Sequence, residues 1–218
     1  AELFPLSVQE RAVETQQGRS TNGKMASIIL NNEHYFCISE FAAQHEPHWK
    51  TVLRVVAEGS KHFEKRPHAL IDAGALLAGV SNADIIKFLL VSHSSDINAV
   101  IYFDTKNDRW EVQDKHGQMW SLINAPINEK DAGSFVFFDE RHCRGADMKL
   151  PPDAVGLLTI GPCMAKSKLM QAAGRMRQLH MAQRVIFIGP EDVTGNISRS
   201  EVETHDRVNS KHLLRWVM

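Results

Sequence analysis

Short, fully apolar runs constrain the fold of this chain more than any other feature of its sequence. Two such runs, at 135–138 and 155–160, enclose a polar loop, and a third spans 185–188. They are too short for helices and lack polar alternation, which indicates strands buried on both faces. Further strands are predicted at 69–72 and 99–103, where apolar residues again run up to an aspartate.

Helical patterns alternate with these strands. Apolar residues recur at helical spacing over 48–58, 81–91 and 167–179, and Ser81 is placed to cap the second helix. Strands that alternate with helices predict an α/β fold with a mostly parallel sheet flanked by helices, and ligands bind such sheets beyond the carboxyl ends of the strands. The polar or glycine residues expected at those ends are Asp72, Asp104, Asp139, Glu140 and Gly161.

The remaining segments have weaker patterns. We expect a short strand at 25–30, a small antiparallel excursion at 110–123, and a polar loop after Pro190 followed by a C-terminal helix. The predicted organisation is an N-terminal helical or irregular extension or subdomain (1–66), an α/β domain (67–190), and the polar loop with its helix (191–218). The chain begins at Ala1 and ends inside a helical pattern, so we expect it to be an excerpt of a longer polypeptide.

The predicted helix at 167–179 has two different faces. The apolar face carries Leu169, Ala172, Ala173 and Met176, and the polar face carries Lys168, Gln171, Arg175 and Gln178. The polar face is either an ordinary solvated surface or a surface that binds a ligand. In the second interpretation Arg175 and Arg177 contact a phosphate, because guanidinium groups match phosphate oxygens.

Two segments carry a resemblance. Arg144-Gly145-Ala146-Asp147, followed by the segment from Gln171 to Arg177, resembles the last two motifs of superfamily 2 helicases and the translocase motor SecA. The resemblance implies a second RecA-like half, whose residues Arg144, Gly145, Asp147, Gln171, Arg175 and Arg177 face a nucleotide. That nucleotide and its Mg²⁺ would be held with an upstream RecA-like half, and none would be bound by this chain alone. These groups are then expected to converge at the carboxyl edge of the sheet.

A second resemblance covers most of the chain. Residues 69–75, 139–151 and 171–179 resemble a family of very large eukaryotic proteins with paired domains of unknown function, classified as ubiquitinyl hydrolases, which are thiol-type deubiquitinating peptidases. Its implied partners are ubiquitin or ubiquitinated proteins. Two positions depart from these patterns: Gln178 stands where helicases have their second arginine, and Ser167 stands where the family tends to have aspartate.

A thiol hydrolase needs a cysteine whose thiolate is formed by a neighbouring base. Three cysteines are candidates: Cys37 lies near several histidines, Cys143 follows His142, and Cys163 precedes a predicted helix. If the family activity belongs to this segment, one of them should be partly exposed and within hydrogen-bonding reach of a histidine ring. Alternatively, the chain is a non-catalytic scaffold that binds partners and retains degenerate helicase motifs.

Composition limits the other possibilities. The chain of 218 residues has 25 Lys and Arg against 26 Asp and Glu, so it lacks the net basic field on which non-specific nucleic-acid binding depends, although a local groove remains possible. Three cysteines without close pairs indicate a reducing compartment, cytoplasmic or nuclear. No apolar run reaches the roughly 20 residues of a membrane span.

Two further motifs are better explained by chance. Gly18, Gly23 and Lys24 have the spacing of a phosphate-binding loop, but Met25 replaces the Ser or Thr that would bind Mg²⁺, and no buried strand precedes them. His34 with Cys37, and His45 with His48, form two pairs with tolerable spacing for zinc. The chain has 11 histidines, so we predict no metal site.

Overall fold

A computed structural model of the chain describes residues 21–30, 34–41, 46–91, 96–142, 148–200 and 207–218. An eight-stranded sheet runs through them in the order β1-β8-β7-β2-β6-β3-β4-β5. Its strands are β1 (Tyr35–Cys37), β2 (Ala69–Ile71), β3 (Ala99–Asp104), β4 (Arg109–Asp114), β5 (Met119–Ser121), β6 (Ser134–Phe138), β7 (Val155–Thr159) and β8 (Arg184–Gly189).

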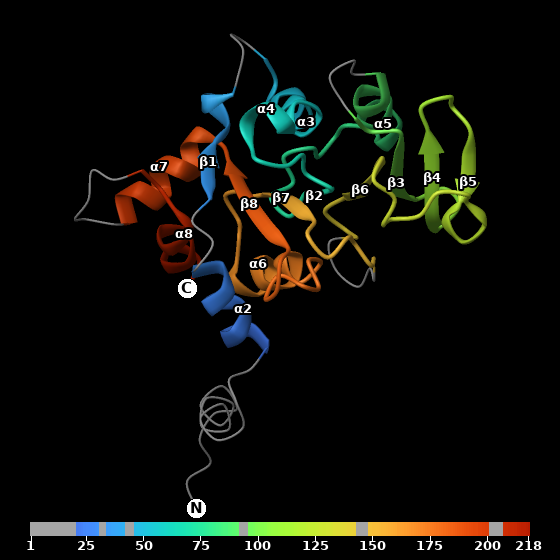
Figure 1. Cartoon of the computed structure of the whole chain (residues 1–218). Coiled ribbons are helices and arrows are strands. Elements are labelled where there is room, and N and C mark those ends of the chain that lie inside the picture. The colour runs from blue at the N-terminus through green and yellow to red at the C-terminus, as the bar shows by residue number, and fades with distance from the viewer. Residues whose placement is uncertain (1–20, 31–33, 42–45, 92–95, 143–147, 201–206) are drawn as a thin grey trace, which may run out of the picture.

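The strands from β1 to β3 in this order are all parallel. β4 and β5 are antiparallel and extend the sheet at one end as a hairpin (Figure 1). This arrangement confirms the predicted α/β fold with a mostly parallel sheet, and it is compatible with a RecA-like fold. The predicted antiparallel excursion is confirmed as well.

Helices cover both faces of the sheet (Figure 1). One face carries α3 (His48–Ala57), the short α4 (Gly59–His62) that follows it, and α5 (Asn82–Val91). The other face carries α2 (Thr21–Leu30), α6 (Lys166–Ala173), α7 (Glu191–Ser200) and α8 (Ser210–Val217). Two short 3₁₀ helices, η1 (Ile38–Glu40) and η2 (Leu122–Asn124), follow β1 and β5.

Strand β6 shows why the short apolar runs need this architecture. Phe135 and Phe137 pack in the α3–α5 layer, whereas Val136 and Phe138 pack in the α6 layer. All four side chains are buried. A strand that is apolar on both faces is stable only when both faces are covered.

Three expectations about helices were wrong. The 25–30 segment is the end of helix α2, because Ile29 is buried in the α6 layer, and a six-residue apolar run has no period that separates helix from strand. The segment after Pro190 is helix α7, which buries Val193 and Ile197 at a spacing of one turn. Helix α6 stops at Ala173, and turns follow to residue 182.

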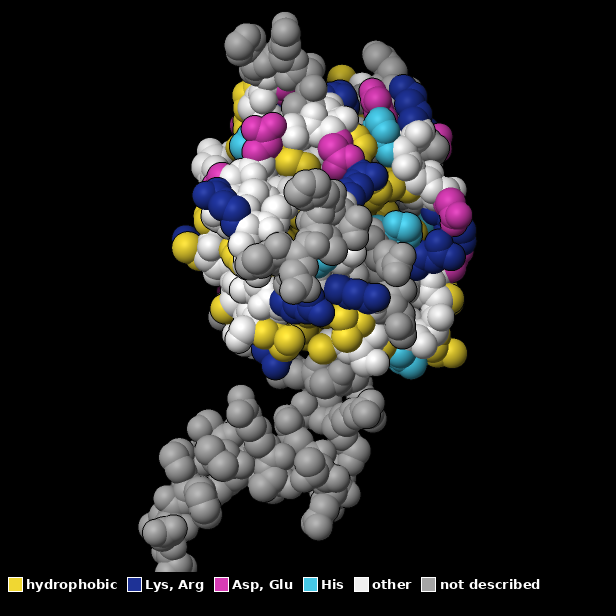
Figure 2. All heavy atoms as spheres, turned by 90° about the vertical axis from the view of Figure 1, so that its left-hand side faces the viewer, with side chains coloured by type: hydrophobic (Ala, Val, Ile, Leu, Met, Phe, Trp, Pro, Cys, Tyr) yellow, Lys and Arg dark blue, Asp and Glu magenta, His cyan; other side chains and the backbone are white. Residues whose placement is uncertain are grey.

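The N-terminal extension contributes directly to the sheet, because β1 pairs with β8 along Tyr35 to Cys37. Tyr35 also donates or accepts a hydrogen bond of 3.0 Å with Thr194 of α7. Figure 2 shows the face on this side of the molecule, where basic, acidic and hydrophobic side chains are interspersed. This mixture agrees with the near-zero net charge of the chain.

Candidate functional site

The switch point of the sheet lies between β2 and β7, since the helices that follow these neighbouring strands cover opposite faces. Ligands of open α/β sheets commonly bind at such a point. Here the backbone closes it: a Cβ added to Gly161 would lie 2.2 Å from the carbonyl oxygen of Gly74. The turn that follows β2, from Asp72 to Leu77, and the end of β7 therefore fill the crevice at the switch point.

Asp72 organises this closure. Its carboxylate accepts hydrogen bonds from the backbone N–H groups of Leu76 (2.9 Å) and Leu77 (3.0 Å) and from the hydroxyl of Thr159 (2.7 Å). Burial raises the pKa of Asp72, and these three hydrogen bonds oppose that effect only in part. These contacts show that Asp72 orders the turn that follows β2.

At the end of β6, Asp139 holds a histidine. Nδ1 of His142 lies 2.7 and 2.8 Å from the two carboxylate oxygens, and the backbone N–H of His142 donates to the same group at 2.8 Å. The imidazole ring stacks on Phe103 with 3.7 Å between centroids and an angle of 21° between planes. Trp110 contacts the ring edge-on. The histidine ring is thus held in one orientation at the carboxyl edge, on the α6 side of the sheet.

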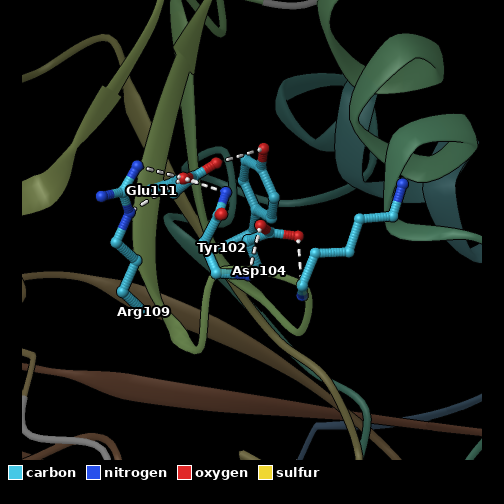
Figure 3. Close-up of polar contacts among 6 residues, drawn as sticks. Tyr102, Asp104, Arg109 and Glu111 are labelled. Atoms are coloured by element: carbon cyan, nitrogen blue, oxygen red, sulfur yellow. Dashed lines mark hydrogen bonds and ion pairs between the residues drawn. The ribbon is translucent and has the colours of Figure 1, made fainter.

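A cavity of about 770 Å³ opens at the same carboxyl edge but on the α5 side of the sheet, between the start of α5 and the turn from β3 to β4. Tyr102 and Glu111 line this cavity, and Figure 3 shows Glu111 between Tyr102 and Arg109. Arg109 donates to Glu111 through Nε and a terminal nitrogen at 3.0 and 2.9 Å. The pKa of Tyr102 is raised to about 12, chiefly by burial and then by Glu111. This cavity is lined by all four of the expected strand-end carboxylates, Asp72, Asp104, Asp139 and Glu140.

Two contacts join the connection from β6 to β7 with α6 and with the turns that follow it. Nζ of Lys168 in α6 lies 2.7 Å from a carboxylate oxygen of Glu140, and the amide of Gln183 donates to the carbonyl oxygen of Pro151 at 2.8 Å. The described ends of this connection, at Glu140 and Pro151, are therefore held beside α6 and the turns that follow it. Of that connection, Cys143, Arg144, Gly145 and Asp147 lie outside the described residues.

The arginines of the second motif lie away from the carboxyl edge. Met176 packs so closely on Gly156 that a Cβ there would lie 2.8 Å from its sulfur. Gly156 is the second residue of β7, which places Arg175 and Arg177 towards the amino end of that strand. This differs from the expected convergence at the carboxyl edge, because α6 runs back along the sheet. Gln171 and Arg177 are exposed, and Arg175 is half-buried.

The candidate thiols that the structure describes lie at the carboxyl edge, but neither has a histidine partner among the described residues. Cys37 ends β1, and its sulfur lies 3.1 Å from the hydroxyl of Ser39. Cys163 is exposed in the loop between β7 and α6. The role of Cys143 stays a prediction, since it lies outside the described residues.

The described residues contain no group of three or more His, Cys, Asp or Glu side chains that could hold a metal ion. His45, from the two pairs whose spacing zinc would tolerate, and Gly18, from the spacing of a phosphate-binding loop, lie outside the described residues. No helix in the described ranges has the length and apolar content to cross a bilayer.

Sequence reasoning named His142 only as the neighbour of Cys143 and missed its pairing with Asp139. The three-residue spacing between them was the available signal, because a carboxylate at a strand end often binds the chain a few residues on. Comparison of the chain with models of protein families, with curated proteins and with solved structures finds no match.

Proposed function

We propose that this chain is the second RecA-like half of a nucleotide-driven motor, within a large polypeptide of the ubiquitinyl hydrolase type. The observation that carries the proposal is that both described ends of the β6–β7 connection, which holds the first helicase-like segment, are bonded to α6 and the turns after it, through Lys168 with Glu140 and Gln183 with Pro151. The mostly parallel sheet with helices on both faces supports it.

The chemistry assigned to this half is stabilisation of phosphate charge. Guanidinium groups of Arg175 and Arg177 neutralise the oxygens of a transferring phosphoryl group, which otherwise carry the developing negative charge. The nucleotide and Mg²⁺ are assigned to the upstream RecA-like half. Arg177 is exposed and Arg175 is half-buried, which supports their assignment to contacts with an upstream domain.

The residues fit this role better than that of a complete nucleotide site. The phosphate-binding loop with its lysine is assigned to the upstream half, because Met25 follows Lys24 where a Mg²⁺ ligand would be needed. Glu140, which could otherwise serve as the acidic residue of a nucleotide site, is already paired with Lys168. Ubiquitin or a ubiquitinated protein as partner, and a cytoplasmic or nuclear location, belong to the same proposal.

Replacement of Arg175 by alanine in the full-length protein tests the proposal. We expect nucleotide turnover to fall on the order of 10²-fold or more, with much weaker loss of nucleotide binding, because the group acts mainly on the transition state. Turnover is measured by phosphate release and binding by a fluorescent nucleotide. Arg199→Ala, which removes an exposed arginine of α7, is the matched control.

Normal turnover in Arg175→Ala, accompanied by a lower melting temperature, would show that this arginine is a structural partner. The scaffold alternative would then account for the retained motifs.

A further inference from the structure

Asp139 and His142 form a short contact between a carboxylate and an imidazole ring. Both carboxylate oxygens lie within 2.8 Å of Nδ1. By comparison, the contact of His62 with Glu58 spans 3.9 Å. A histidine that is bound through Nδ1 to a carboxylate has its tautomer and orientation set, and its second nitrogen is then the reactive one.

Nε2 is that second nitrogen in His142. Within the described residues it has no hydrogen-bond partner, and the side chain is about one quarter exposed. Stacking on Phe103 prevents the ring from turning, so Nε2 keeps one direction. Nδ1–H donates to Asp139, which leaves a lone pair on Nε2 that can accept a proton.

We propose that His142 is the general base of a hydrolytic site for neutral carbonyl esters, with Asp139 as its positioning residue. This activity is separate from the nucleotide half-site. Nε2 takes a proton from water while the water oxygen bonds to the carbonyl carbon. The bond to the leaving group then breaks, and the leaving group takes the electron pair and the proton from Nε2, which yields an acid and an alcohol.

The surroundings of the ring favour a carbonyl compound over a phosphate. Two carboxylates, Asp139 and Glu140, lie within three residues of His142 in the chain, and Phe103 and Trp110 flank the ring. Carboxylates repel a polyanion, and aromatic rings suit an apolar acyl or aryl group. Phosphoryl transfer needs cationic groups that neutralise its oxygens, and Lys168, which contacts Glu140 beside this histidine, is already paired with that carboxylate.

Hydrolysis of p-nitrophenyl acetate by the 218-residue chain tests the proposal. We expect steady-state turnover that His142→Gln lowers at least ~10-fold, since general bases typically contribute about 10²-fold or more. Asp139→Asn should lower kcat several-fold with KM within about twofold, because it acts through the ring and not through substrate binding. His116→Gln changes an exposed histidine at the β4–β5 turn and should leave the rate unaltered.

A second measurement needs no variant. Diethyl pyrocarbonate, which acylates accessible imidazole nitrogen, should abolish turnover of the folded wild-type chain, and hydroxylamine should restore it. Equal rates in the wild type and His142→Gln, or no loss on acylation, would overturn the proposal. Hydrolysis of p-nitrophenyl phosphate that depends on His142 would overturn the assignment to carbonyl esters.

Discussion

Thr159 makes the closure of the sheet's switch point directly testable. Its side chain is fully buried, and its hydroxyl donates to Asp72 at 2.7 Å and accepts from the backbone N–H of Gly74 at 2.8 Å. Thr159→Val keeps the shape of the side chain but removes both hydrogen bonds. No cavity is created, so the change in stability reports the polar contacts.

The magnitude follows from the two bonds. A hydrogen bond to a charged group contributes about 1.5–3 kcal/mol, and an N–H group that loses its acceptor costs about 1–3 kcal/mol when buried. Gly74 is only half-buried, so we expect Thr159→Val to lower the free energy of unfolding by about 3 kcal/mol. In a chain of this size that corresponds to a fall in melting temperature of about 6–12 °C.

Thr159→Ser is the matched control, because it keeps the hydroxyl and loses only a methyl group, at a cost of about 1 kcal/mol. Urea unfolding followed by circular dichroism at pH 7 gives both values. If the valine variant is as stable as the serine variant, the hydroxyl does not hold the Asp72 turn, and the account of the closed switch point fails.

Two further predictions concern the same core. Nδ1 of His68 accepts a hydrogen bond from the backbone N–H of Val155 at 3.1 Å, and burial lowers the pKa of His68. Because the folded-state pKa of His68 lies below the unfolded value, the free energy of unfolding should fall as the pH drops from about 6.5. The variant His68→Gln should show a smaller fall when unfolding is measured between pH 7.5 and 5. Gly161→Ala should cost more than ~3 kcal/mol, because the new Cβ meets backbone atoms of Gly74. Gly195→Ala in α7, where the Cβ meets only the end of Arg199 at 3.6 Å, should instead stabilise by about 0.5–1 kcal/mol; equal melting temperatures for the two variants would contradict this.

The sequence alone determined the strands that are buried on both faces. Runs such as 135–138 are apolar throughout and bounded by polar residues, and a strand covered on both faces is the structure that such a run can adopt at that length. Helix α5 was also predictable, because a serine precedes its apolar helical pattern at a capping position. In the structure Ser81 accepts a hydrogen bond from the N–H of Asp84 in the first turn. These signals are local, so they can be recognised without knowledge of the partners.

Tertiary structure alone decided where the reactive groups lie. Strand β1 has only three residues and exists because β8 offers it a parallel partner. The switch point is closed by Gly74 and Gly161, whose contact joins segments far apart in the chain. Arg175 was expected at the carboxyl edge, but packing of Met176 on Gly156 carries the end of α6 towards the other end of β7. Contacts of this kind depend on strand order and side-chain volume across the sheet, which a local pattern of residues does not record.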